Sequence, residues 1–210
     1  LGRGIALDAN NNVYVAGETL SANYPISAGA ADSTFGNNFE GFITALSADG
    51  NALLYSTYLG GTGIERVNDI AVTAGGEAIV VGETNSIDFP RVGPTSSFGG
   101  DMDAFVARFR DTGAIYWSLY YGGSGVDRAV GVTLDTVSAT GGIGDAFVVG
   151  QTSSPNGIAA TGTGIYQTTP GGLVDGFLVE FRPSGARSSQ LATYIGGPLD
   201  DEAMSVAVKP

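Results

Sequence analysis

The 210-residue chain contains no histidine and no cysteine. Without them, a Ser-His-Asp or Cys-His nucleophile, thiol redox chemistry and a zinc site with His or Cys ligands are excluded. The chain also lacks any run of about 20 apolar residues, the length that a membrane-spanning helix needs. We therefore expect no membrane insertion, and we expect the chain not to be an enzyme of the classes that depend on these residues.

Basic residues are also scarce, with 9 Lys and Arg against 21 Asp and Glu, for a formal net charge of -12. Binding to nucleic acid needs a basic stripe that meets the phosphates, and this chain would repel a polyanion. We expect no nucleic-acid partner. Lys209 is the single lysine, and this acidic composition favours a secreted or cell-surface protein.

Glycine is abundant, with 34 residues, more than twice the ordinary usage of about 7%. Hydrophobic residues make up 43% of the chain, enough to bury a core. No 11-residue window shows a helical apolar stripe, whereas short segments alternate apolar and polar residues between Gly, Asn, Asp and Pro. The composition predicts an all-β protein with many turns.

Four sequence blocks recur three times in the same order, and each block is typical of a strand. Phe42, Phe105 and Phe177 occupy one register, so we expect all three to be buried. The first block lies at 12–19, 77–84 and 145–152, and its strand-like part ends in Gly. The second lies at 40–43, 103–106 and 175–178, and the third, which ends in Gly-Gly, at 58–61, 120–123 and 194–197. The fourth block is a short apolar strand at 5–7, 70–72, 132–134 and 206–208.

This pattern predicts a single domain of β-propeller blades over residues 1–210, each blade having four antiparallel strands. The repeats are 1–65, 66–127 and 128–201, and 202–210 begins a fourth. The fold class is thus three blades plus the first strand of a fourth. Propellers typically have four to eight blades, so we expect completion by further repeats of a longer chain or by other subunits.

Several of these segments resemble the SBBP β-propeller repeat of bacterial and archaeal surface proteins. The resemblance implies a propeller in an exported, often multidomain protein, and it carries over no catalytic residues. The third repeat departs from the pattern at 153–157, where Ser-Ser-Pro-Asn-Gly replaces the usual acid-aromatic-Pro stretch. The segments that carry the resemblance are Asp8 to Gly17, Asn23-Tyr24-Pro25, Tyr55 to Gly61, Asp88-Phe89-Pro90 and Asp103 to Ala107.

Acidic residues recur in register after the Gly-Gly pairs, at Glu65, Asp127 and Asp201, and again at Glu40, Asp103 and Asp175. Carboxylates and loop carbonyls are the ligands that Ca²⁺ takes, so Glu65, Asp127 and Asp201 are candidate Ca²⁺ ligands. The alternative is that each acid accepts backbone N–H groups and holds the same turn in every blade. Repetition at equivalent positions favours the turn, and we expect no other cofactor.

Two further chemistries have candidate residues. Asp101 with Asp103, and Asp200 with Asp201, are carboxylate pairs of the kind that glycosidases use, although neighbouring acids in so acidic a chain are usually solvated. Trp117, Tyr120 and Tyr121 are candidates for stacking on sugars, but they align with Tyr55, Leu59 and other apolar residues of the remaining repeats. We expect them to pack between blades.

Three long loops join the second and third strands, at 20–39, 85–102 and 153–174. Loops of about 20 residues are usually functional or disordered. We expect them to be ordered, anchored by Tyr24, Pro25, Phe89 and Pro90, and to mediate contacts between blades, subunits or surface partners. The sequence predicts a non-enzymatic interaction scaffold, with a glycan- or Ca²⁺-binding module as the alternative and a glycoside hydrolase as the third reading.

Overall fold

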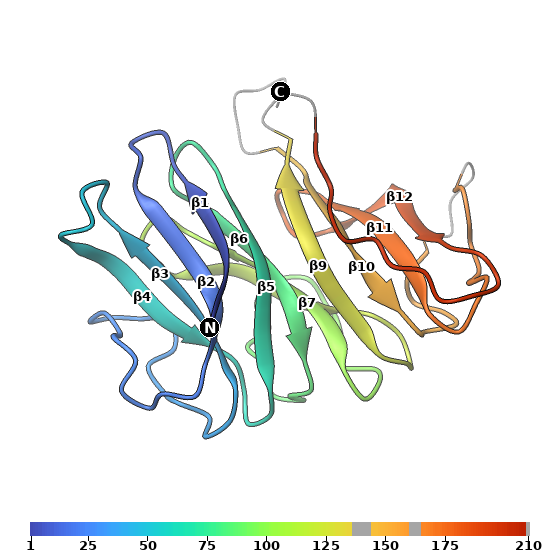
Figure 1. Ribbon diagram of the computed structural model, residues 1–210, viewed down its shortest axis with the longest axis horizontal. Coiled ribbons are helices and arrows are strands. Elements are labelled where there is room, and N and C mark those ends of the chain that lie inside the picture. Colours follow the sequence, from blue (N-terminus) through green and yellow to red (C-terminus); the bar gives the residue numbers. More distant parts are fainter. Residues whose placement is uncertain (136–143, 160–164, 209–210) are drawn as a thin grey trace.

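The computed structural model describes residues 1–135, 144–159 and 165–208, which form strands and no helix (Figure 1). Three antiparallel sheets of four strands stand side by side and do not close into a ring. The predicted all-β fold with blade-like sheets is confirmed. The first sheet is β1 (Gly2–Leu7), β2 (Val13–Thr19), β3 (Glu40–Leu46) and β4 (Leu53–Leu59); the second is β5 (Glu65–Val72), β6 (Ala78–Thr84), β7 (Asp103–Phe109) and β8 (Ile115–Tyr121); the third is β9 (Asp127–Leu134), β10 (Ala146–Thr152), β11 (Asp175–Phe181) and β12 (Arg187–Ile195).

The three sheets share one register. The glycine that ends the first sequence block lies opposite the repeated phenylalanine in every sheet, as Gly17–Phe42, Gly82–Phe105 and Gly150–Phe177. A side chain at Gly82 would come within 1.9 Å of the Arg66 carbonyl oxygen and 2.8 Å of the Phe105 ring. Glycine is therefore required where the backbone and the ring approach so closely. All three phenylalanines are buried, as predicted.

The core consists of two layers of apolar side chains, one between each pair of neighbouring sheets. Trp117 of β8 is buried, and its Nε1 donates a hydrogen bond at 2.9 Å to the carbonyl oxygen of Pro183, in the turn between β11 and β12. Its ring lies 6.3 Å from that of Phe181. Tyr120 and Tyr121 are buried as well. These aromatic residues pack within and between the sheets, as expected.

The first strand of each sheet, called the inner strand here, contacts its counterpart in the next sheet: β1 lies against β5, and β5 against β9 (Figure 1). β5 and β9 are longer than the predicted strands 70–72 and 132–134, because they begin at Glu65 and Asp127. Polar residues such as Arg66 and Asn68 interrupt the apolar pattern there. Arg66 nevertheless pairs with Glu83 of β6, while Asn68 lies at a shift in the register.

The segment 202–208 begins like an inner strand. The Asp201 N–H donates to the Val174 carbonyl oxygen at 2.9 Å, as the Glu65 N–H does to Phe39 and the Asp127 N–H to Met102, both at 2.8 Å. Residues 202–208 nevertheless form no strand with the described part of the chain, which corrects the expected strand at 206–208. Each of β1, β5 and β9 pairs with the second strand of its sheet, whereas 202–208 has no such pairing among the described residues. A fourth repeat therefore stays a prediction.

The long loops run along the outer strands β4, β8 and β12. Ser27 N–H donates to the Ser56 carbonyl oxygen at 3.0 Å, and Tyr58 N–H to that of Asp32 at 3.1 Å. Val92 pairs with Ser118 in the second sheet. These contacts occupy the free edges of the sheets, which would otherwise invite pairing with another chain. Within the third loop, residues 160–164 lie outside the described residues.

Candidate functional site

The inner strands and their neighbours place charged residues at one end of the three sheets. Glu18, Glu83 and Gln151 share one position, directly after the glycine that faces the repeated phenylalanine. Arg66 lies opposite Glu83 in the pairing of β5 with β6. Arg128 lies opposite Gln151 in the pairing of β9 with β10. Each pair joins an inner strand to the second strand of the same sheet.

The same side chains also connect one sheet with the next. Glu18 binds Arg3 of its own sheet at 3.0 Å and Arg66 of the second sheet at 2.9 Å. Glu83 binds Arg66 at 2.8 Å and Arg128 of the third sheet at 2.5 Å. The hydrogen bond to Glu83 raises the pKa of Arg66. Acids and bases therefore alternate across the sheet boundaries.

The third sheet continues the series with a different pair of residues. With the Gln151 amide assigned in the orientation that satisfies both neighbours, its oxygen accepts a hydrogen bond from Arg128 at 2.8 Å and its nitrogen donates to Glu202 at 2.5 Å. Glu202 occupies the inner-strand position that Arg66 and Arg128 hold in the preceding sheets. Where the earlier repeats have arginine, this position has glutamate, and the position that holds glutamate in the first two sheets has glutamine in the third. We call the whole series the charge ladder: Arg3, Glu18, Arg66, Glu83, Arg128, Gln151 and Glu202.

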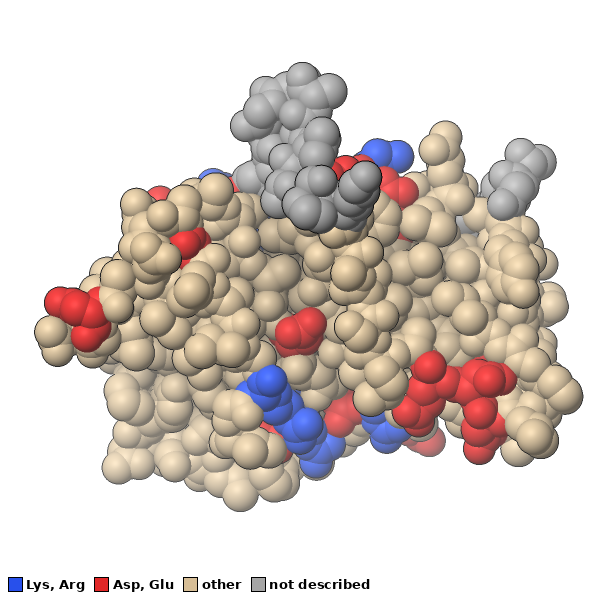
Figure 2. Space-filling model, turned by 45° about the horizontal axis from the view of Figure 1, so that its top comes forward, with Lys and Arg blue, Asp and Glu red and all other residues tan. Residues whose placement is uncertain are grey.

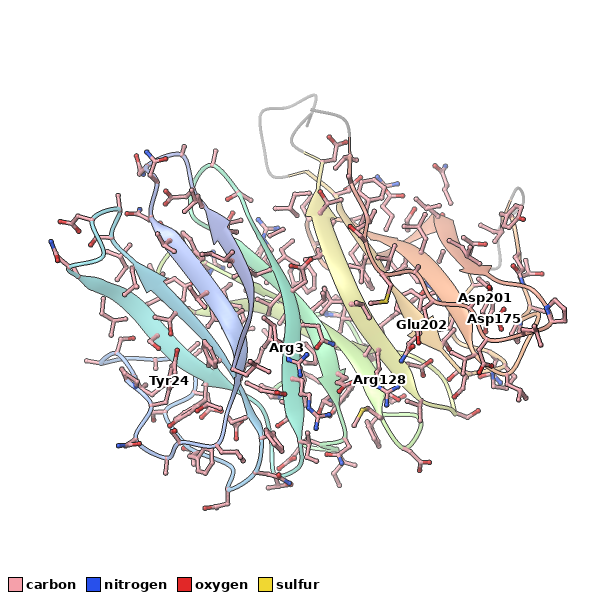
Figure 3. All side chains as sticks on the ribbon, viewed as in Figure 1. Arg3, Tyr24, Arg128, Asp175, Asp201 and Glu202 are labelled. Atoms are coloured by element: carbon pink, nitrogen blue, oxygen red, sulfur yellow. The ribbon has the colours of Figure 1, made fainter. Side chains whose placement is uncertain are left out.

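The charge ladder lines an open groove of about 570 Å³, together with Asn68, Val130 and Met204. Basic side chains gather at one place on this face, with acidic side chains beside them (Figure 2), and Figure 3 labels Arg3, Arg128 and Glu202 along it. The three guanidinium groups are all paired with carboxylates. The groove is therefore a polar surface suited to recognition, and its groups are held by ion pairs.

The segment 2–25, which contains β1, β2 and the start of the first long loop, matches the family model SBBP, described as a beta-propeller repeat. Over these residues the chain is similar to an SBBP β-propeller repeat. The resemblance seen in the sequence is thereby confirmed for these residues. A search of the curated proteins found no match to the chain.

The matched segment 2–25 includes Tyr24 and Pro25, two of the predicted loop anchors. Tyr24 donates or accepts a 2.8 Å hydrogen bond with Thr44, and its ring centroid lies 4.5 Å from that of Phe42. Pro25 is exposed. The tyrosine thus holds its loop against its own sheet, and contact with another protein stays a prediction.

The equivalent loop in the second sheet is held by Phe89. Its ring centroid lies 4.8 Å from that of Phe105, and its N–H donates to the Tyr120 hydroxyl at 3.1 Å. The Pro90 carbonyl accepts a hydrogen bond from the Ser118 hydroxyl. In the third sheet Ile158 is buried, and its carbonyl accepts from the Tyr121 hydroxyl at 2.7 Å. The contacts of Phe89 and Pro90 pack the second loop onto its own sheet, whereas the contact of Ile158 joins the third loop to β8 of the second sheet.

The candidate Ca²⁺ ligands lie apart from one another: Glu65 begins β5, Asp127 begins β9, and Asp201 precedes the segment 202–208. Each accepts a hydrogen bond from the second glycine of its Gly-Gly pair, at 3.0, 2.8 and 2.7 Å respectively. Glu65 also accepts from the Thr84 hydroxyl at 2.5 Å, and Asp127 from that of Ser154 at 2.7 Å. This geometry supports the turn-holding role, while Ca²⁺ binding stays a prediction.

The sequence did not predict that the acids after the Gly-Gly pairs lie close to the acids that begin the third strands. Glu40 and Glu65 are one example. The Cβ position of Gly60 lies 2.0 Å from Oε1 of Glu40 and 2.3 Å from Oε2 of Glu65. Burial, with the nearby Glu65 charge adding to it, raises the pKa of Glu40 to about 8. The Glu40 Oε1 atom is buried and has no hydrogen-bond partner. The two acids are far apart in the sequence, so only the fold reveals the contact.

The other connections repeat this junction. Burial and the nearby Asp127 raise the pKa of Asp103 to about 6, and burial raises the pKa of Asp127 as well. Figure 3 labels Asp175 and Asp201 at the third junction. No group of three or more acids placed to hold a metal ion is found among the described residues.

The proposed catalytic pairs are not arranged alike. Asp103 is buried and accepts hydrogen bonds from the N–H groups of Gly99 and Gly100 at 2.8 and 3.2 Å, whereas Asp101 is exposed. Asp200 is exposed and Asp201 accepts the Gly197 N–H. In each pair, backbone N–H groups hold one carboxylate in a turn and the other carboxylate is exposed.

Proposed function

We propose that this protein is a non-enzymatic interaction scaffold in a secreted or cell-surface assembly. The observation that carries the proposal is an uncovered sheet face on β1. Ile5 is 70% exposed, whereas the residues at the same register position in the second and third sheets, Ile70 and Val132, are 4% and 7% exposed. In the second and third sheets, this position is buried against the preceding sheet. The first sheet has no preceding sheet among the described residues.

The exposed face has the composition of an interface. Leu7 lies two residues from Ile5 on the same side of β1 and is 54% exposed. Apolar residues at positions that are core in the other sheets favour contact with a partner that resembles a blade. The partner is another protein subunit or a further repeat, and the acidic composition supports an exported setting.

The chemistry of the site supports a binding role over catalysis. The carboxylates with shifted pKa values, such as Glu40 and Asp103, lie at turns between sheets and bind backbone N–H groups. The arginines of the charge ladder are paired with acids. A scaffold uses such groups to keep its sheets in fixed positions, so that exposed faces and loops are presented rigidly.

The test is self-association measured by sedimentation velocity over a range of protein concentrations. We expect association that Ile5→Asp abolishes, because a charge cannot be buried unpaired in an apolar interface. Ile87→Asp is the matched control, since Ile87 is also exposed, at 76%, but lies in a loop. Persistent monomer in the unchanged protein, or equal effects of both substitutions, would overturn the proposed interface.

A hydrolase is the alternative that a second measurement addresses. Turnover of model glycosides that is lost in Asp103→Asn or Asp201→Asn would overturn the non-enzymatic proposal. Each carboxylate accepts backbone hydrogen bonds, so each variant must first be shown to keep the unfolding profile of the unchanged protein.

A further inference from the structure

A cleft of about 320 Å³ lies between the second and third sheets, and it shares no residue with the groove of the charge ladder. We call it the loop cleft. Both sheets that contribute to it are complete. Its size is at the lower end of the range of sites that hold small molecules. It is lined by residues 94–97 of the second long loop, by 119–122 at the end of β8, and by Gly157, Phe181, Gly185 and Arg187.

Two positions that are apolar at the boundary between the first two sheets carry polar groups at the loop cleft. Ile115 of β8 packs against the core, whereas Arg187 of β12 holds the same register position and is exposed. Leu59 of β4 is buried, and its counterpart in β8 is Tyr121. The Tyr121 hydroxyl donates to the Ile158 carbonyl oxygen at 2.7 Å. This boundary thus has a guanidinium and a phenol in place of two aliphatic side chains.

The charge of Arg187 is not balanced by an acid. Among the described residues no carboxylate lies within ion-pair distance of it, whereas every arginine of the charge ladder is paired. Its Nη1 donates to the carbonyl oxygens of Gly157 and Ile158 at 3.2 and 3.1 Å, which fixes the guanidinium beside the cleft. Burial raises the pKa of Tyr121, and the nearby Arg187 charge opposes this rise. No acid lines the cleft, although the chain has 21 acids against 9 bases.

The second long loop adds another cation and several hydroxyl groups. Arg91 also forms no ion pair within the part of the chain that the structure describes; it lies 5.9 Å from the Tyr120 ring centroid and donates to the Ser96 carbonyl oxygen. The Ser96 hydroxyl accepts from the Tyr120 N–H at 3.0 Å and keeps its own hydrogen to donate. Thr95 and Ser97 line the cleft and are exposed. Each hydroxyl can both donate and accept a hydrogen bond.

We propose that the loop cleft binds a saccharide that carries a carboxylate, such as a hexuronic acid. Arg187 pairs with the carboxylate through the N–H groups that the carbonyl oxygens do not bind, because guanidinium and carboxylate groups match in geometry and charge. Thr95, Ser96 and Ser97 exchange hydrogen bonds with the ring hydroxyls. The unpaired cation favours an acidic over a neutral sugar, and the hydroxyl groups favour a sugar over a simple anion. This site goes beyond the scaffold role and does not rest on it.

The test is a chemical-shift titration of the isotope-labelled protein at low ionic strength with D-galacturonate, D-galactose and inorganic phosphate. Galactose is a neutral sugar with the same ring stereochemistry, and phosphate is an anion without a sugar ring. We expect galacturonate to shift the amide signals of Ser97, Gly122 and Gly157, which line the cleft. It should bind at least about tenfold more tightly than either other probe, as one charge-assisted contact allows.

Variants of the lining residues locate the contact. Arg187→Gln should weaken galacturonate binding at least about tenfold. Arg110→Gln is the matched control, because Arg110 is exposed, forms no ion pair among the described residues and does not line the cleft; it should leave the affinity unchanged. Ser97→Tyr fills the cleft and keeps both arginines, so it should abolish binding even if Arg187→Gln also disturbs residues 157–159.

Several results would overturn the proposal. Equal affinities for galacturonate and galactose would show that the cation does not select the ligand, and equal affinities for galacturonate and phosphate would show a site for anions alone. The absence of shifts at the lining residues would reject the cleft as a binding site. Unchanged galacturonate affinity in both Arg187→Gln and Ser97→Tyr would place the binding elsewhere on the protein.

Discussion

At the scale of single residues, the junctions between sheets depend on glycines enclosed by carboxylates. The Cβ positions of Gly60, Gly122 and Gly196 lie 2.0, 2.4 and 2.0 Å from the nearest carboxylate oxygens, which belong to Glu40, Asp127 and Asp175. A real Cβ atom cannot occupy such a position unless the acid moves. The recurring Gly-Gly pairs are therefore needed because the acids approach the backbone so closely.

Gly60→Ala should destabilise the protein by about 2–4 kcal/mol, since the methyl group would displace both Glu40 and Glu65. Gly75→Ala is the matched control, because the nearest atom to its Cβ position is 3.9 Å away. Chemical denaturation measures both. If the two variants lose similar stability, the close approach of the acids does not determine the choice of glycine.

The Glu40 carboxyl group predicts how stability depends on pH. Burial raises its pKa from 4.5 to about 8, so between these values the folded protein retains a proton that the unfolded chain releases. The free energy of unfolding should therefore fall as pH rises from about 5 to 8, by about 2–4 kcal/mol for this group. Asp103, with a pKa of about 6, contributes in the same direction.

Thermal unfolding at several pH values tests this dependence. Glu40→Gln keeps the shape of the side chain and removes the titration, so its melting temperature should vary less with pH than that of the unchanged protein. A melting temperature that rises between pH 5 and 8 in the unchanged protein, and equally in the variant, would contradict the assignment.

At the scale of elements, each long loop covers the outer edge of its sheet and is held by an inward-facing side chain. Phe89→Ala should cost about 3–5 kcal/mol, because the ring is buried against Phe105 and Tyr120 and its loss leaves a cavity. Ile87→Ala, two residues away and exposed, should change stability by less than about 0.5 kcal/mol. Equal losses in urea denaturation would show that Phe89 is not an anchor.

The strands show what the sequence predicts and what it does not. β2, β6 and β10 follow the predicted blocks closely, because Val, Ile, Phe and Tyr alternate there and glycine ends the pattern. β5 and β9 were predicted too short, since Glu65, Arg66, Asn68 and Asp69 read as a loop. Some of their partners come from other sheets, as when Asn68 donates to the Ala129 carbonyl at 3.0 Å. Such contacts between sheets leave no local signal.

The candidate site likewise has a part that the sequence predicts and a part that it does not. The acids at Glu65, Asp127 and Asp201 were predicted from their repetition, and their turn geometry is now visible. The charge ladder was not predicted, because Glu18 and Arg66 are distant in the sequence and only the packing of the inner strands brings them together. The register of one sheet against the next determines that contact.

At the scale of the whole molecule, calcium would act on three junctions at once. If Glu65, Asp127 and Asp201 bind Ca²⁺, excess EDTA should lower the melting temperature, since a ligand of the native state stabilises it by mass action. Adding Ca²⁺ back should restore it, and Mg²⁺ is the control for general ionic effects. An unchanged melting curve in EDTA would leave these acids with the turn-holding role alone.

The charge ladder should couple the three sheets. Arg66 binds Glu18 of the first sheet and Glu83 of the second, so Arg66→Met leaves two largely buried carboxylates with one cation fewer each. We expect a loss of about 1–3 kcal/mol. Arg182→Met is the control, because Arg182 is 46% exposed and pairs within the third sheet, where exposed ion pairs contribute less than about 1 kcal/mol.

Rescue distinguishes coupling between sheets from a local loss of packing. In Arg66→Met, a second change of Glu18→Gln should restore part of the stability by removing one uncompensated carboxylate, whereas a packing defect would remain unchanged. Denaturation of the single and double variants gives the coupling energy of the pair. A coupling energy near zero would mean that the ion pair between Arg66 and Glu18 does not couple the first two sheets, and that their packing depends on the apolar layer between them.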